Sequence, residues 1–129
     1  MKETSRKGRG MGYRSEVMIS TTEEGYERLV AMCDAAGVEY PLVSRSVEPE
    51  HVEHIEGCVV FGWEQIKWYD EAFAEVAAVM QAIEELSGEG VPVRFVRIGE
   101  DAGDIETRGD VEGLAVFPEP SMSIELLYT

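Results

Sequence analysis

The first clear pattern along the chain is an alternation of apolar and polar residues in the stretch RSEVMIS. Val17 and Ile19 fall on one face and the residues between them on the other, which is typical of a β-strand. Thr21 or Thr22 can then cap a helix, since acidic residues follow directly and apolar residues recur at helical spacing over positions 26–33. The pattern therefore predicts a strand followed by a helix.

The middle of the chain is less regular. Residues 39–57 hold two prolines and mixed polarity, and we expect a long connection there. The segments CVVFGW and QIKWY follow and are rich in β-branched and aromatic residues, which favour strands. They predict either a tight hairpin or one strand bent at Gly62, and we favour the hairpin.

A second helix is predicted over EAFAEVAAVMQAIEEL, with Asp70 as its N-cap. Its expected buried stripe consists of Phe73, Val76, Ala77, Met80 and Ile83. The stretch VPVRFVRIG then resumes as a strand. The segments LAVF and SIELLY predict two further short strands, separated by a turn at residues 118–121.

The order strand, helix, strand pair, helix, strand predicts an α+β fold. More specifically, it matches a ferredoxin-like βαββαβ sandwich with an appended C-terminal β-hairpin, in which both helices cover one face of the sheet. Residues 1–12 are basic and glycine-bearing, and we interpret them as a flexible basic arm, or as an upstream extension if Met11 is the natural start. Residues 13–129 are expected to form a single acidic α+β domain.

The charge of the chain limits its partners. There are 11 Lys and Arg residues against 26 Asp and Glu residues, which gives −15. From Ser15 onward the balance is 6 against 25, or −19. Such a surface repels nucleic-acid backbones and anionic membranes and favours cationic partners: a basic protein surface, a polyamine or a metal ion. Solubility alone is the alternative reason for the acidity.

The stretch RIGEDAGDIE concentrates acidic residues after an apolar run. It is not an EF-hand loop, because counting from Asp101 the third position is Gly103. Three interpretations remain: a looser cation site, a solvated turn in which Arg97 or Arg108 pairs locally, and an acidic loop that binds a protein. We take the following residues as candidate protein-binding residues: Glu100, Asp101, Asp104 and Glu106.

The stretch WEQIKWYD places Trp63, Trp68 and Tyr69 within seven positions, beside charged residues. In an alternating strand these rings point to both faces, and both faces cannot be core if helices cover only one. An exposed aromatic face flanked by charge is typical of interface hot spots. We therefore add these three residues to the candidate protein-binding set, with coverage by the C-terminal hairpin as the alternative.

Neither a catalytic nor a metal site is predicted. His51, His54 and Cys58 are zinc-ligand types, but the second close pair that a zinc site needs is missing. A nucleophilic Cys or Ser would need a base and a group that orients it, and both histidines lie in one segment. We expect no cofactor. Cys33 and Cys58 are the only cysteines, and no apolar leader precedes the first strand, which indicates a reduced, cytoplasmic setting without a membrane span.

Several short motifs resemble a family of small proteins encoded by phages and prophages. These motifs are MGYRSEV, IKWYD, and FVRIGED with DIE, and the resemblance runs from Met11 to about Glu106. It leaves out residues 39–57 and the last twenty. The family implies a bacterial host cytoplasm during infection and brings no catalytic residues.

These observations together predict a non-enzymatic, phage-type protein that binds a host or phage macromolecule. The expected partner is a basic host or defence protein that handles nucleic acid, which the acidic surface would inhibit as a nucleic-acid mimic without binding nucleic acid itself. Two alternatives stay open. One is a module that binds a small ligand or a divalent cation, and the other is a virion or assembly component that forms homo-oligomers.

Overall fold

The first strand and helix form as their patterns predict. A computed structural model describes residues 12–129, so the expected arm lies outside the described residues apart from Gly12. Strand β1 (Ser15–Thr22) leads directly into helix α2 (Glu23–Ala35). Thr22 is the N-cap, and its hydroxyl oxygen accepts a hydrogen bond from the Gly25 N–H at 3.0 Å. The capped helix therefore begins where local chemistry favours it.

The predicted hairpin between CVVFGW and QIKWY is wrong. Both segments contribute to one strand, β3 (Cys58–Ile66), and its hairpin partner is β2 (His51–Ile55), from the region expected to be a connection. Gly62 is needed for close approach to β1 and not for a turn. A Cβ at Gly62 would lie 2.0 Å from the carbonyl oxygen of Val17.

Helix α3 (Ala74–Gly88) begins later than predicted, and Asp70 does not cap it. Residues 70–72 form a turn, and the Phe73 N–H donates to the Tyr69 carbonyl at 2.9 Å. Val76 and Ile83 of the expected stripe are buried, whereas Phe73 and Met80 are only partly buried. The buried residues of α3 are Val76, Val79, Ala82, Ile83 and Leu86.

The main sheet has five strands in the order β2-β3-β1-β4-β5, and all neighbouring strands are antiparallel. Strand β4 (Val93–Gly99) was expected, whereas β5 (Ile105–Asp110) was not. Strands β6 (Val116–Pro120) and β7 (Ile124–Tyr128) form a separate two-stranded sheet. A C-terminal hairpin is thus present, but the predicted turn at residues 118–121 is wrong, because β6 continues through Pro120. The α+β class is confirmed.

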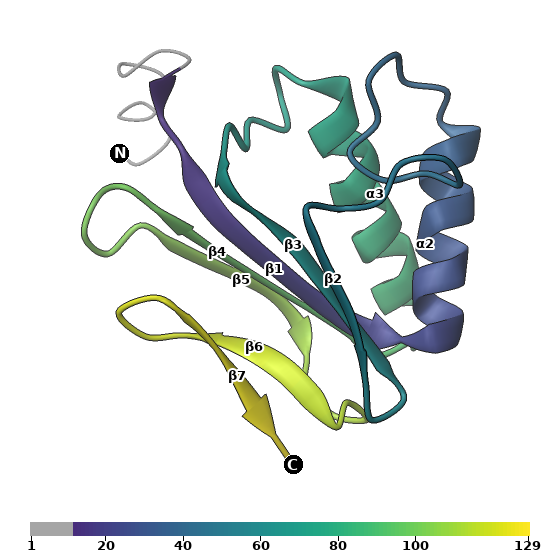
Figure 1. The fold of residues 1–129 in the computed structure, drawn as a ribbon, viewed down its shortest axis with the longest axis vertical. Helices are drawn as coiled ribbons and strands as arrows, with labels where there is room; N and C mark the ends of the chain where they lie inside the picture. The colour runs from purple at the N-terminus through teal and green to yellow at the C-terminus, as the bar shows by residue number, and fades with distance from the viewer. Residues whose placement is uncertain (1–11) are drawn as a thin grey trace.

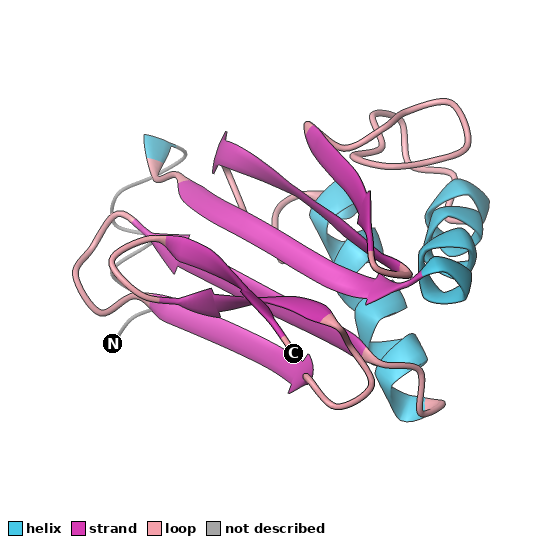
Figure 2. Ribbon diagram, turned by 60° about the horizontal axis from the view of Figure 1, so that its bottom comes forward, coloured by secondary structure: helices cyan, strands magenta, loops and turns pink. Residues whose placement is uncertain are grey.

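The elements stack in three layers. Helices α2 and α3 lie side by side on one face of the main sheet, and the β6–β7 hairpin lies on the other side, as Figures 1 and 2 show. The larger core fills the space between the helices and the sheet. A smaller cluster forms between Cys58, Leu114 and Phe117. Both faces of the central strands are therefore covered. Within residues 12–129, no helix has the length and apolar character needed to cross a membrane.

Candidate functional site

The acidic turn between β4 and β5 is organised around a buried arginine. Arg97 lies on the same face of β4 as Val93 and Phe95, and its side chain is only 2% exposed. Its guanidinium donates two hydrogen bonds to Asp104, from Nη2 to Oδ1 at 2.8 Å and from Nη1 to Oδ2 at 3.2 Å. Further bonds run from Nε to Glu106 at 3.0 Å and from Nη1 to the Ser15 hydroxyl at 3.1 Å. The turn thus covers a guanidinium whose N–H donors are hydrogen-bonded to carboxylates and a hydroxyl.

Tyr13 ties the start of the described chain to the same cluster. Its hydroxyl donates to Asp104 Oδ2 at 2.6 Å and accepts from the Asp101 N–H at 3.0 Å. Its own carbonyl accepts from the Tyr69 hydroxyl at 2.8 Å. Gly99 makes room for this arrangement, since a Cβ there would lie 2.2 Å from Asp104 Oδ2 and 2.4 Å from the Tyr13 hydroxyl oxygen. We call Tyr13, Ser15, Arg97, Asp104 and Glu106 the Arg97 cluster.

The ionisation of the cluster follows from its contacts. Burial on its own lowers the pKa of Arg97, but the hydrogen bonds to Asp104 and Glu106 outweigh it, so the pKa is raised above its ordinary value. For Glu106, burial raises the pKa, whereas hydrogen bonds from Arg97 and Arg108 lower it by more, so the net shift is downward. Both partners are therefore held in their charged forms.

The four acidic residues predicted to form a protein-binding loop differ in how exposed they are. Asp104 is buried inside the cluster, so the expectation that it is exposed for a partner is wrong. Glu106 is partly buried and pairs with Arg97. Asp101 is partly buried, and of the four only Glu100 is exposed, with its carboxylate accepting the backbone N–H of Arg14 at 2.7 Å. The acids of the turn are used mainly to hold the structure together.

The three predicted interface aromatics are buried as well. Trp63, Trp68 and Tyr69 are 6%, 3% and 7% exposed, so the expected exposed aromatic face is wrong. Ring centroids lie 5.5 Å apart between Trp63 and Trp68 and 5.9 Å apart between Trp68 and Phe95. The tryptophans belong to the core under the helices, and the C-terminal hairpin is not what covers them. They stabilise the fold, and in this conformation they are not available to a partner.

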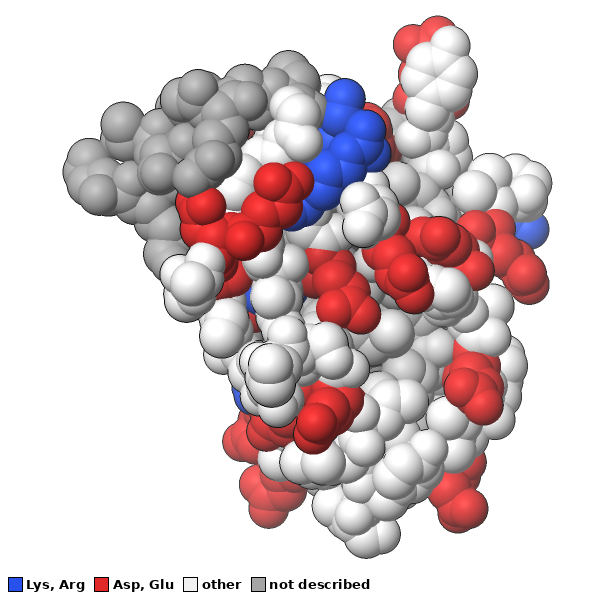
Figure 3. Space-filling model, turned by 60° about the vertical axis from the view of Figure 1, so that its left-hand side comes forward, with Lys and Arg blue, Asp and Glu red and all other residues white. Residues whose placement is uncertain are grey.

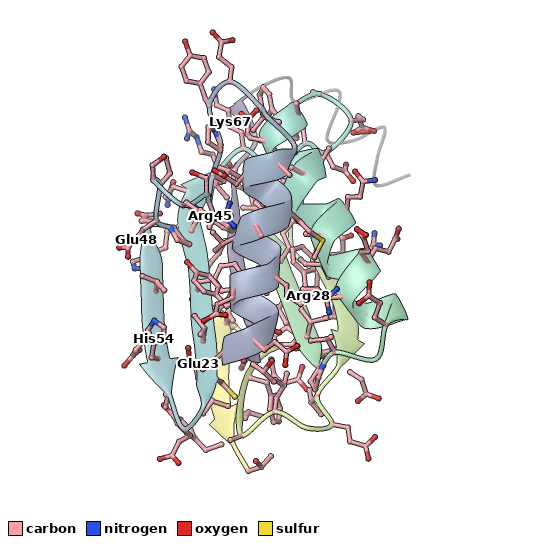
Figure 4. All side chains as sticks on the ribbon, turned by 90° about the vertical axis from the view of Figure 1, so that its right-hand side faces the viewer. Glu23, Arg28, Arg45, Glu48, His54 and Lys67 are labelled. Carbon is pink, nitrogen blue, oxygen red and sulfur yellow. The ribbon has the colours of Figure 1, made fainter. Side chains whose placement is uncertain are left out.

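The two histidines pair with separate carboxylates on the exposed β2 edge. His54 Nδ1 lies 2.9 Å from Glu23 at the start of α2, and His51 Nε2 lies 3.1 Å from Glu64 on β3. Figure 4 shows His54 and Glu23 near one another at the bottom of the view. Over residues 12–129, no group of three or more His, Cys, Asp or Glu side chains is placed to hold a metal ion.

Both cysteines are buried and free. Burial raises the pKa of Cys33 to about 11, so its thiol is poorly suited to act as a nucleophile at neutral pH. Cys58 packs in the small cluster with Leu114 and Phe117. These contacts support packing roles for both thiols.

Most arginines of the described chain are engaged by the protein's own carboxylates. The ion pairs join Arg28 to Glu89, Arg45 to Asp34, Arg94 to Glu119, Arg97 to Asp104 and Glu106, and Arg108 to Glu106 and Glu84. Many other carboxylates are exposed, and Figure 3 shows them spread over much of one face with few basic side chains among them. The surface therefore presents negative charge to approaching molecules.

Local pairing of Arg97 is one of the sequence-based interpretations of the turn, but sequence reasoning missed that Arg97 is buried. Arg97 occupies a position in VRFVRIG at which alternation calls for a core residue, and a buried guanidinium requires carboxylate partners. That position could have indicated that some of the acids that follow Arg97 are buried partners. Comparison of the chain with protein-family models, with curated proteins and with solved structures gave no match.

Proposed function

We propose that this protein is a non-enzymatic, phage-type binding protein whose acidic surface engages a basic host or phage macromolecule. The favoured partner is a nucleic-acid-handling host or defence protein in the bacterial cytoplasm, which would be inhibited because the carboxylates compete with nucleic-acid phosphates. The observation that carries this proposal is the excess of exposed carboxylates on a body whose arginines are largely neutralised internally. Electrostatic attraction would give fast, salt-sensitive association.

The chemistry of the described residues supports binding more than catalysis. The histidines each face a single exposed carboxylate, and both thiols are packed away from solvent. The carboxylates of Asp104 and Glu106 are both paired with Arg97, and the pKa of Glu106 is lowered. A general acid or base must exchange protons near neutral pH, which these paired groups are not tuned to do.

We also infer that β1 to β4 with α2 and α3 form a ferredoxin-like unit. The order β2-β3-β1-β4 and the antiparallel pairing of neighbours support this. On this view β5 and the β6–β7 hairpin are additions at the edge and on the outer face of the sheet. Because such a scaffold carries many unrelated functions, it supports no activity by itself.

The first experiment is affinity capture from bacterial lysate with the tagged full chain, followed by mass spectrometry. The captured protein is then purified and bound in the presence of duplex DNA. We expect DNA to compete for the partner and high salt to release it, because both act on the same basic surface. A partner that binds the protein and DNA at the same time, or that resists molar salt, would contradict the proposal.

A pair of variants separates charge from shape. Changing the exposed residues Glu24, Glu27, Glu84 and Glu85 to glutamine removes four negative charges, whereas changing them to aspartate keeps the charge. Because steering acts over a distance, we expect a several-fold lower association rate at low salt for the glutamine variant only. Equal rates for both variants would show that the negative surface does not steer binding.

A second candidate function is homo-oligomeric assembly. It is favoured by the exposed apolar side chains of Met122, Leu127 and Tyr128 at the β6–β7 hairpin, which are 99%, 42% and 62% exposed. Edge strands with such side chains can pair between copies. Sedimentation tests it: a concentration-dependent dimer lost in a Leu127→Lys variant supports assembly, and a monomer at high concentration contradicts it.

A further inference from the structure

The start of β1 and the ends of β3 and β4 lie toward the upper left of Figure 1, and two adjoining hollows are lined by residues from there. The first has a volume of about 470 Å³ and lies between residues 14–16 at the start of β1, residues 64–65 of β3 and residues 98–100 at the end of β4. The second, about 350 Å³, continues past β3 to the start of α3. Arg14, Glu64 and Gln65 line both, so the hollows form one groove, which we call the end groove.

A local irregularity of β3 shapes the end groove. Gln65 has a φ of +55°, a left-handed conformation that is strained for a residue with a side chain. The register of β1 against β3 shifts between Ser15 and Val17, as at a β-bulge. Arg14 Nη1 donates to the Gln65 carbonyl at 2.8 Å and holds the irregular backbone in place. Bulges of this kind redirect side chains, and this one lies among the residues that line the end groove.

The lining combines an acidic rim with an apolar wall. Glu16, Glu64 and Glu100 line the first hollow, and Glu50 and Glu75 line the second. The cationic side chains among the lining residues are Arg14 and Lys67, so carboxylates outnumber them. The apolar wall of the second hollow presents the partly buried side chains of Leu42, Ile66 and Phe73, whereas Trp63 and Val76 also line it but are buried.

We propose that the end groove binds a segment of a partner protein in which an arginine or lysine stands beside an apolar side chain. The cation is placed against Glu16 and Glu64, and the apolar side chain packs on Ile66 and Phe73, which are only partly buried. Charge complementarity selects a cationic occupant, and the apolar wall selects a peptide over a small counterion. The inference rests on the proposed function and names the surface that would contact the basic partner.

The probe is a blocked hexapeptide of alternating arginine and leucine, titrated into the ¹⁵N-labelled full chain and followed by NMR. We expect amide shifts centred on residues 14–16 and 64–67. An arginine–glycine hexapeptide of equal charge should bind several-fold more weakly, because it lacks the apolar side chain. A glutamate–leucine hexapeptide should not bind.

Matched variants locate the charge contribution. Glu16→Gln with Glu64→Gln removes two rim carboxylates, and Glu27→Gln with Glu53→Gln removes two exposed carboxylates elsewhere. We expect the first pair to weaken binding about three- to tenfold, the range for loss of one or two exposed ion pairs, and the second to change it little. Equal weakening by both pairs of substitutions, or amide shifts centred outside the groove, would overturn the proposal that the end groove binds the peptide. Neither result would contradict the proposal that the acidic surface binds a basic partner.

The chain's own basic residues provide the last control. Lys2, Arg6, Lys7 and Arg9 are replaced by glutamine in the full chain, and the titration is repeated. Binding within about twofold of the unmodified chain supports a partner segment as the occupant. If the peptide reaches the groove only in this variant, the occupant is the protein's own N-terminal segment and the proposal is overturned. Failure of the hexapeptide together with successful lysate capture would reject the groove alone.

Discussion

The Arg97 cluster and the end groove are both rich in carboxylates, but the two sets differ in burial and in their partners. In the cluster, the Asp104 side chain is 3% exposed and bonded to a guanidinium that is 2% exposed. At the groove, the Glu64 side chain is 58% exposed and its partner is a surface histidine. The two regions are joined by neighbouring residues, since Gly99 touches the cluster and Glu100 lines the groove.

The difference comes from the burial of the nearest cation. A guanidinium in the core has five N–H donors that water cannot reach, so it must draw carboxylates and hydroxyls around it. Arg14, at the groove, is exposed and can be satisfied by water as well as by the Gln65 carbonyl. An acidic sequence therefore leaves its carboxylates exposed to a partner only where no buried arginine pairs with them.

Removing the central cation should have the largest effect. Arg97→Met leaves Asp104 buried without its guanidinium, and we expect a loss of about 3–5 kcal/mol in the free energy of unfolding. Urea denaturation followed by tryptophan fluorescence measures it. Arg45→Met is the control, because Arg45 pairs with Asp34 at the surface and should cost about 1 kcal/mol or less. Similar losses for both variants would remove the distinction between the two regions.

A methyl group at Gly99 should have the next largest effect. Gly99→Ala pushes Asp104 and the Tyr13 hydroxyl away from the backbone, and we expect a loss of about 1–3 kcal/mol. In Gly88→Ala, at the end of α3, the new methyl meets nothing within 4 Å and should leave stability equal or slightly higher. Thermal or urea unfolding measures both variants. An unchanged stability in Gly99→Ala would contradict the close packing around Gly99.

Loss of one hydroxyl tests the edge of the cluster. Tyr13→Phe removes the donor to Asp104 and the acceptor for the Asp101 N–H, and we expect destabilisation by about 1–2 kcal/mol. Tyr40→Phe, at a side chain that is 75% exposed, serves as the control and should leave the free energy of unfolding unchanged. Equal unfolding midpoints for the two variants would show that Tyr13 does not stabilise the cluster.

The smallest effect is a pH dependence. Because the pKa of Glu106 is lowered in the folded protein, its ionised form contributes stability that is complete above the ordinary value of 4.5 and is lost as pH falls through the folded value. We therefore expect Glu106→Gln to be less stable than the unmodified protein at pH 7, with the gap narrowing below about pH 4.5. Urea unfolding at pH 7, 5 and 4 measures the gap, and Glu64→Gln is the exposed control. A stability difference that widens as the pH falls would contradict a lowered pKa of Glu106.

Part of this structure could be predicted because the information is local. The period of two in β1, and Thr22 followed by acids at the start of α2, describe which side chains share a face and where hydrogen-bond donors are capped. By contrast, β5 has the sequence IETRGD and β2 the sequence HVEHI, and neither alternates cleanly. These strands form because they complete the hydrogen bonds of β4 and β3.

The candidate site was harder to predict, since it depends on burial. The sequence identified RIGEDAGDIE and WEQIKWYD as conspicuous, but it placed Asp104 and both tryptophans at the surface. A strand's periodicity shows which residues lie together, and it is silent on whether another layer covers them. Here the two helices bury one face of β3 and the β6–β7 hairpin packs beyond the other.

By itself, the sequence determined the α+β class, the first strand and helix, and a negative charge that limits the choice of partner. Only the tertiary structure decided which carboxylates surround Arg97 and which line the end groove. The physical reason is that charge and periodicity are properties of the chain, whereas desolvation depends on contacts between residues far apart in sequence, such as Tyr13 with Asp104 and Arg97 with Ser15.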